Sequence, residues 1–250
     1  MIAAPAAHGW RRRAQPLLGT LVEIGIVDGR ADKHASDAGF AVIAAVQACL
    51  SRYERASDIA RFNGLRRGES LAMRPLTAEV LKAASQLERL TDGLFDISLG
   101  SAPGGWRIEG NRLVKLAGCT RLDLGGIGKG FAIDHAVQAL VAAGVGSGWV
   151  NAGGDLRAFG DAELPIGLRD ERRGGVRHFA TLRDGAFATS HFGRETRSSL
   201  AHRGVRSVQA HVSVAAPCCL WADALTKVVA ASGDTAHPVL AHFGASAWQH

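Results

Sequence analysis

Glycine, lysine and acidic residues are concentrated in one short stretch of this chain, residues 122–134. Four glycines fall within positions 125–130, and Lys129 lies among them. Glycine lets the backbone come close to a ligand and adopt positive φ. A helix that follows would present unpaired N–H groups and a partial positive charge, which favour phosphate. The stretch therefore predicts a phosphate-binding corner, and a plain turn between a strand and a helix is the alternative.

Two familiar phosphate motifs do not fit this stretch. A P-loop needs glycine five residues before Gly-Lys and a hydroxyl residue after it, but these positions hold Asp123 and Gly130. A dinucleotide-binding fingerprint that starts at Gly126 needs glycine or alanine at its last position, where Phe131 stands. We reject both motifs, so the chemistry must come from a different arrangement.

Hydrophobic periodicity and turn residues predict the elements that position these groups. We expect a strand over residues 17–27 and a helix over 35–52. Ser57 is expected to cap a short helix that ends at Asn63-Gly64, and Thr77 to cap another helix. Further expected elements are a hairpin around residues 109–111, a helix over 132–143, a strand–bend–strand over 149–160, a strand over 208–215 and a helix over 218–232. Their order lacks the regular spacing of a doubly wound sheet, so the predicted fold class is α+β.

Composition narrows the class of protein. The chain has 250 residues, of which 47% are hydrophobic and 21% charged, and this suits one compact unit or two intimately packed halves. A net charge of +6 favours anionic ligands, but the basic residues are scattered and aromatic residues make up only 6%, so we expect no nucleic-acid partner. No stretch approaches the roughly 20 apolar residues that span a membrane. Residues 1–16 lack a signal-peptide pattern, so we expect a cytoplasmic protein with no stable membrane anchor.

With these motifs in view, the chain resembles the ApbE family, the FAD:protein FMN transferases. The matching segments occur in family order: LLGT at 17–20, SRY at 51–53, SDIARFN at 57–63, TDGLFD at 91–96, LDLGGIGKG at 122–130, NAGGD at 151–155, ATS at 188–190 and ADALTK at 222–227. The resemblance implies a T-fold-like α+β architecture of two related, intimately packed halves. It would form a single domain over residues 17–250, after an N-terminal extension of residues 1–16.

The resemblance also implies a reaction. FAD would bind between the halves with Mg²⁺ at its pyrophosphate, and FMN would move from FAD to a Thr or Ser hydroxyl of an acceptor protein, with release of AMP. Phosphoryl transfer of this kind depends mainly on positioning and charge neutralisation, and Mg²⁺ prefers oxygen ligands. By position, the implied metal ligands are the Gly126 carbonyl, the Asp223 carboxylate and the Thr226 hydroxyl. Asp223 is also the candidate catalytic residue, because it could help to deprotonate the acceptor hydroxyl.

Other positions match family residues that hold the nucleotide. Leu18 stands where a methionine near the flavin is usual, and Tyr53 where an aromatic ring stacks on FAD. Core packing is the alternative for Tyr53 and turn capping is the alternative for Asp123. The full set of cofactor-binding positions is Leu18, Tyr53, Leu94, Phe95, Asp96, Asp123, Lys129 and Leu200; core packing is also the alternative for Phe95 and Leu200, and turn capping for Asp96.

The chain departs from the family pattern at several positions. Lys227 stands where threonine is common, and a protonated lysine cannot ligate Mg²⁺. His191 follows Thr189-Ser190 where glycine is usual. Residues 199–203 lack the family's His-x-x-Asp-Pro pattern, so His191 or His202 could replace the missing histidine or be plain surface residues. Lys227 and the altered segment 199–203 leave open a flavin-binding protein without transfer, and a second alternative is FAD hydrolysis to FMN and AMP, in which water replaces the acceptor hydroxyl.

Overall fold

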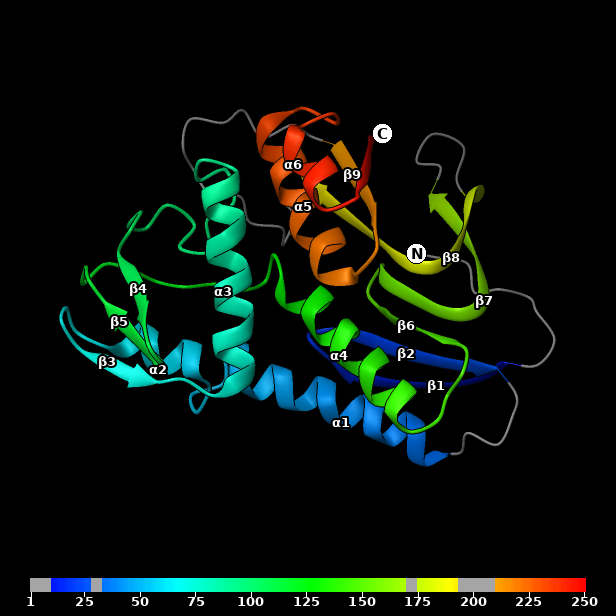
Figure 1. The fold of residues 1–250 in the computed structure, drawn as a ribbon, viewed down its shortest axis with the longest axis horizontal. Helices are drawn as coiled ribbons and strands as arrows, with labels where there is room; N and C mark the ends of the chain where they lie inside the picture. The colour runs from blue at the N-terminus through cyan, green and yellow to red at the C-terminus, as the bar shows by residue number, and fades with distance from the viewer. Residues whose placement is uncertain (1–9, 28–32, 170–174, 193–209) are drawn as a thin grey trace.

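The computed structural model describes residues 10–27, 33–169, 175–192 and 210–250 and has a mixed α+β architecture (Figure 1). The predicted fold class is therefore confirmed. One apolar core runs from the large sheet to the smaller sheet, since Val22 and Val212 belong to the same buried cluster as Leu71 and Leu113. That the two halves are related to each other stays a prediction.

A seven-stranded antiparallel sheet forms the larger layer of the molecule. Its order is β1-β2-β6-β7-β8-β9-β10, so strands from the two ends of the described chain lie in one sheet. The strands are β1 (Trp10–Leu17), β2 (Thr20–Val27), β6 (Gly148–Ala152), β7 (Asp155–Arg169), β8 (Val176–Phe192), β9 (Ala210–Ala216) and β10 (Ser246–Gln249). The β2–β6 pairing brings the first strands beside the strand–bend–strand segment that the sequence predicted.

The first hairpin corrects one expectation. The sequence predicts a single strand over residues 17–27, but the chain reverses at Leu18 and Gly19, and Leu17 pairs with Thr20. Both turn residues have positive φ, 55° at Leu18 and 70° at Gly19. Two-residue hairpin turns require this conformation, and leucine adopts it only rarely. The LLGT segment is therefore a tight turn that places Leu18 at the end of the sheet.

Helices α1 (Lys33–Leu50), α4 (Gly128–Ala142) and α5 (Cys219–Ser232) lie side by side over one face of the large sheet, with α4 in the middle (Figure 1). Alternate strand residues such as Val150 are buried beneath them. The neighbouring residue Trp149 points to the opposite face and joins a second buried cluster with Leu164 and Phe187. Because successive strand residues face opposite sides, this sheet buries apolar side chains on both faces.

The smaller part contains α2 (Asp58–Gly64), α3 (Pro75–Leu90) and a three-stranded sheet in the order β3-β5-β4. Its strands are β3 (Ser70–Ala72), β4 (Trp106–Glu109) and β5 (Arg112–Lys115), which confirms the hairpin predicted around residues 109–111. Ser57 caps α2 as predicted, because its hydroxyl accepts the Ala60 N–H at 2.9 Å. Thr77 lies inside α3 instead and donates to the buried Asp58 carboxylate at 2.7 Å, so the predicted Thr77 cap is wrong.

The short helix α6 (Pro238–His242) precedes β10. None of the helices in the described ranges combines the length and the apolar character needed to cross a membrane.

Candidate active site

The glycine-rich corner is an extended segment that leads into the first turn of α4. The Asn63 side chain holds both backbone groups of Leu122, since it donates to the carbonyl at 2.9 Å and accepts the N–H at 2.7 Å. The next N–H, that of Asp123, donates to the Ile97 carbonyl at 2.8 Å. Helix α4 begins at Gly128, four residues before the predicted start. Lys129 therefore lies in the first helical turn, where the helix dipole favours an anion.

Gly130 allows α4 and α5 to approach each other closely. A β-carbon at this position would overlap the Cys219 carbonyl oxygen and would lie 2.9 Å from the Asp223 β-carbon. The Gly130 N–H also donates to the Asp223 carboxylate at 3.1 Å. The glycine that the sequence singled out for ligand approach thus also serves helix packing, and it brings residues 93 positions apart into contact.

Two lysines and two aspartates meet where these helices approach the sheet. The Lys129 ammonium pairs with Asp155 at the start of β7, and it lies 3.8 Å from the Asp223 carboxylate. On the other side, the Lys227 ammonium pairs with the same Asp223 oxygen one helical turn along α5. The side chains of Asp155 and Asp223 are 1% and 0% exposed, whereas that of Lys129 is 30% exposed. The cluster is buried on the Lys227 side and open on the Lys129 side.

Opposing effects set the protonation of this cluster. Burial by itself raises the pKa of Asp223, but the charges of Lys129 and Lys227 and the hydrogen bonds that it accepts outweigh burial and hold that pKa below its ordinary value. Burial lowers the pKa of Lys129, an effect that Asp223 opposes and Lys227 reinforces. The cluster combines two carboxylates with two amines, so its charges cancel when all four groups are ionised.

A third carboxylate fixes the start of α5. Asp134, on α4, accepts the backbone N–H groups of Cys219 and Leu220 at 2.9 and 2.8 Å. Arg157 on β7 donates to the same carboxylate at 2.6 Å. A carboxylate at a helix N-terminus is favoured by the unpaired N–H groups and by the dipole. Asp134 therefore positions α5, and with it Asp223, relative to α4.

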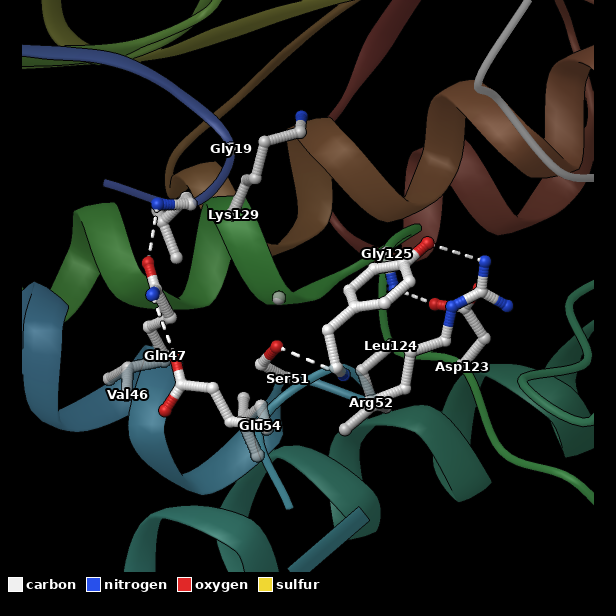
Figure 2. A pocket seen from close by; sticks show the side chains of 14 residues that line it. Gly19, Val46, Gln47, Ser51, Arg52, Glu54, Asp123, Leu124, Gly125 and Lys129 are labelled. Atoms are coloured by element: carbon white, nitrogen blue, oxygen red, sulfur yellow. Dashed lines mark hydrogen bonds and ion pairs between the residues drawn. The ribbon is translucent and has the colours of Figure 1, made fainter. Parts of the chain in front are cut away.

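A cavity of about 430 Å³ opens in front of Lys129 (Figure 2). Its volume lies within the roughly 300–1,000 Å³ of small-molecule sites. The walls come from the β1–β2 turn, the C-terminal end of α1 and the glycine-rich corner. The lining residues are Leu18, Gly19, Val46, Gln47, Leu50, Ser51, Arg52, Tyr53, Glu54, Asp123, Leu124, Gly125, Gly128 and Lys129.

Hydrogen bonds hold the turn at one side of this cavity. The Leu18 N–H donates to the Gln47 side-chain oxygen at 2.6 Å, and the Gln47 amide donates to Glu54 at 2.7 Å. Figure 2 shows Gln47 and Glu54 along one wall and the Arg52–Asp123 ion pair on the other. The unusual backbone of Leu18 is thus held in place by α1.

Arg52 and Tyr53 form the rim of the cavity. Arg52 pairs with Asp123 at 3.0 Å, donates to the Tyr53 hydroxyl at 2.7 Å and lies 4.8 Å from the centre of the Tyr53 ring. Tyr53 is 81% exposed, so it is no part of the core. Asp123 accepts the Gly125 N–H at 2.8 Å, which makes it a turn-capping residue that also lines the cavity. An exposed ring beside a cation offers a surface on which a flat ligand can stack.

This corner, cavity and charge cluster are built from the segments on which the sequence resemblance rests. Comparison with protein-family models tests this resemblance directly, and the ApbE family model matches residues 18–116 and 107–246. The chain belongs to the ApbE family.

Individual relatives agree with this family. The chain is 27% identical over 140 residues to a protein named FAD:protein FMN transferase from Vibrio cholerae, and that alignment covers 44% of the chain and 42% of the relative. The chain thus matches less than half of that relative's length in sequence.

Solved ApbE structures share the fold over nearly the whole chain. The Vibrio cholerae flavin transferase ApbE superposes with a TM-score of 0.82 at 21% identity, covering 96% of this chain and 93% of that one. The apo form of Pseudomonas stutzeri flavinyl transferase ApbE gives 0.82 at 23% identity, with 96% and 90% covered. The ApbE protein of Thermotoga maritima gives 0.79 at 22% identity, with 94% and 91% covered.

The structure brings some of the predicted cofactor positions together and separates others. Leu18, Tyr53, Asp123 and Lys129 all line the cavity. Leu94, Phe95 and Asp96 do not line it, although Asp123 reaches this segment through its hydrogen bond to Ile97. Phe95 is a core side chain, 4% exposed. The Asp96 carboxylate accepts the N–H groups of Ser98 and Gly100 and the Ser98 hydroxyl, so it stabilises a turn. Leu200 lies outside the described residues, as does His202.

The three positions predicted to ligate Mg²⁺ also lie together, but they surround Lys227. Asp223 holds the Lys227 ammonium, and the side-chain carbons of Lys227 pack beside Gly126, at 3.5 Å from where a β-carbon would be. Ser190 accepts from Lys227 at 3.0 Å and lies 2.9 Å from the Thr226 hydroxyl, which donates to the Asp223 carbonyl at 2.7 Å. The described residues contain no group of three or more His, Cys, Asp or Glu side chains suited to a metal ion. In this arrangement the Lys227 ammonium takes the place among these groups that the predicted Mg²⁺ would occupy.

Sequence reasoning passed over several residues of the site. Asp155 and Ser190 stood within family-like segments but had no assigned role. Asp155 was detectable as the acid after a glycine bend, and its second carboxylate oxygen has no hydrogen-bond partner among the described residues. Lys227 was recognised only as a departure from the family. The Asp–Lys spacing of four residues on a predicted helix was the signal for the ion pair.

Proposed function

We propose that this protein transfers FMN from FAD to a Thr or Ser hydroxyl of an acceptor protein and releases AMP. Family membership supports the reaction class, and the name of the Vibrio cholerae relative supports the substrates. The observation that carries the proposal is Lys129, which stands at the first turn of α4 and in the wall of a ligand-sized cavity, with its ammonium in the charge cluster. A helix start beside a lysine is a favourable seat for a pyrophosphate.

The residues of the cavity suit the two ends of FAD in different ways. Tyr53 and Arg52 offer an exposed stacking surface at the rim, and Leu18 and Leu124 offer apolar walls. Lys129 would contact the pyrophosphate that joins the two ends of FAD. Asp123, held by Arg52 and the Gly125 N–H, is placed to accept hydrogen bonds from a ligand at the corner.

In the proposed step, the acceptor hydroxyl oxygen forms a bond to the phosphorus of the FMN half. The bond from that phosphorus to the oxygen of AMP breaks, and AMP leaves with its phosphate. The hydroxyl proton passes to a base, for which Asp223 is the candidate carboxylate. Lys129 neutralises negative charge that moves onto the leaving phosphate, which is the main task of the protein in phosphoryl transfer. None of these steps is assigned to a metal ion.

Incubation of the purified protein with FAD, with and without an acceptor protein, tests the proposal. We expect AMP and a flavin-labelled acceptor only when the acceptor is present. AMP and free FMN without acceptor would show FAD hydrolysis instead. FAD that is bound but intact under both conditions would contradict both enzymatic functions and leave flavin binding alone. The control is Lys129→Met, which we expect to lose AMP release because it removes the cation at the cavity wall.

A further inference from the structure

The position of Lys227 carries an inference that deepens the proposed function and rests on it. Its ammonium is inserted among the groups that would otherwise be available to a divalent cation. It pairs with Asp223 and donates to the Asp223 carbonyl at 3.1 Å and to the Ser190 hydroxyl at 3.0 Å. All three partners present oxygen atoms, and the residue is only 7% exposed.

The hydrogen-bond directions around Lys227 are mutually consistent. Thr226 donates to the Asp223 carbonyl, so the Ser190 hydroxyl must donate to Thr226. Ser190 then accepts from Lys227, which as an ammonium can only donate. Each hydroxyl hydrogen is therefore used, and Lys227 supplies the positive end of the chain of bonds. These oxygen atoms therefore form a cation-binding site that is filled by the Lys227 ammonium.

Charge and space both disfavour a further cation. The ammonium groups of Lys129 and Lys227 pair with Asp155 and Asp223, so a divalent ion bound to the free protein would add two positive charges that no further carboxylate of this cluster balances. Uncompensated buried charge is costly. The side-chain carbons of Lys227 also fill the space beside Gly126. An Mg²⁺ ion needs about six oxygen ligands near 2.1 Å, and here the Asp223 oxygens already accept from Lys227 and from the Gly130 N–H.

We propose that the Lys227 ammonium replaces the divalent cation in this site, so that the protein binds FAD, and cleaves it, without Mg²⁺. Lys227 would keep Asp223 charged and in place, while Lys129, at the cavity wall, would contact the pyrophosphate. The cation next to the pyrophosphate would then be the Lys129 side chain and not a metal ion.

The decisive experiment measures FAD affinity by quenching of flavin fluorescence, in EDTA and in excess Mg²⁺. For the unaltered protein we expect the two dissociation constants to agree within about twofold. Lys227→Thr should make binding depend on the metal, because it removes the ammonium, opens the space beside Gly126 and adds a hydroxyl oxygen. We expect its affinity to fall at least about tenfold in EDTA and to recover with Mg²⁺, and Mn²⁺ to bind it in an electron paramagnetic resonance titration.

Two controls keep the result interpretable. Lys227→Met removes the charge but fills the space, so its weakened FAD binding should not recover with Mg²⁺. Lys115→Met alters a buried lysine away from the cavity and should bind FAD as the unaltered protein does. If Lys227→Thr does not fold, as judged by circular dichroism, the measurement on the unaltered protein still tests the proposal. If the FAD affinity of the unaltered protein falls about tenfold or more in EDTA and is restored by Mg²⁺, the proposal is overturned.

This test is independent of transfer. FAD binding without Mg²⁺ in a protein that never releases AMP would overturn the proposed function and the metal-free cleavage, and it would support the cation replacement for FAD binding alone. AMP release that requires Mg²⁺, together with Mn²⁺ binding by the unaltered protein, would support the transfer and overturn the replacement.

Discussion

Lys115 and Lys227 are both buried, in different parts of the molecule, and their partners differ. Lys115 lies in the small sheet and donates to the Phe62 and Asn63 carbonyls at 3.3 and 3.1 Å, at the C-terminal end of α2. Lys227 pairs with a buried carboxylate. A helix C-terminus attracts a cation through its unpaired carbonyls and dipole, so Lys115 has a sufficient structural role.

Burial of a lysine therefore does not by itself indicate a functional site. The partners of Lys115 are neutral and local to one helix end, and its ammonium lies 5.2 Å from the Phe62 ring. The partners of Lys227 include a charged residue that also lies 3.8 Å from Lys129, at the cavity wall. That shared carboxylate is the reason why we propose a functional role for Lys227.

Asp223→Asn should have the largest effect, because it leaves Lys227 without its buried counter-charge and weakens the hold on Lys129. We expect a loss of about 3–5 kcal/mol in the free energy of unfolding, the usual cost of an unpaired buried charge, and loss of AMP release. Urea denaturation and an AMP assay measure the two effects. The exposed Asp161 gives the matched control, Asp161→Asn, which should change neither. A fully active and stable Asp223→Asn protein would remove Asp223 from the account.

Lys115→Met tests the purely structural role of Lys115. It leaves two carbonyl groups without their donor, and each unsatisfied buried group costs about 1–3 kcal/mol. We expect lower stability in urea but unchanged FAD affinity and unchanged AMP release per folded molecule. If Lys115→Met impaired FAD binding as strongly as Lys227→Met, the distinction between a structural and a functional lysine would fail.

Gly130→Ala tests the helix packing around Lys227, because the Lys227 region, unlike the Lys115 region, depends on the close approach of α4 and α5. The added methyl group would overlap the Cys219 carbonyl. Overpacking of this kind costs about 1–3 kcal/mol, and the shift between helices should also slow AMP release. Gly118→Ala is the control, since no described atom lies within 4 Å of the place that its added methyl group would take. Equal stability and activity of the two variants would contradict the packing role of Gly130.

The smallest expected effect is a dependence on alkaline pH. Burial, and to a lesser degree Arg121, lowers the pKa of Lys115 below its ordinary value, although Cys119 and Glu69 oppose this. Between the folded and the unfolded pKa, the unfolded chain binds more protons, so stability should rise with pH through that window. Below the folded pKa the full cost of burying the charge is present. Urea denaturation at a series of pH values should show this rise in the unaltered protein and not in Lys115→Met. A parallel pH dependence in both proteins would contradict the assignment.

The sequence predicted much of this molecule because its strongest signals are local. Helical periodicity located α1 and α5, the Glu109-Gly110-Asn111 turn located the β4–β5 hairpin, and Ser57 indicated the start of α2. Two predictions were wrong because the conformation there depends on residues distant in the sequence. Leu18 adopts a left-handed backbone only because the hairpin and Gln47 hold it there, and Thr77 donates to Asp58 instead of capping α3.

The sequence identified several residues of the site but few of the contacts between them. Asp123 and Lys129 line the cavity, as expected from the glycine-rich stretch. No local pattern could show that Lys129 pairs with Asp155, or that Lys227 fills the space among Gly126, Asp223 and Ser190, because these contacts join α4, α5 and the large sheet. The ligand set predicted for Mg²⁺ stays a prediction that competes with the cation replacement.

The most direct test of that central claim is a crystal structure of the FAD complex grown with Mn²⁺, examined for anomalous scattering. We expect no manganese peak at Asp223, with the Lys227 ammonium on its carboxylate and the FAD pyrophosphate near Lys129. A manganese peak bound to Asp223, with Lys227 displaced, would contradict that claim.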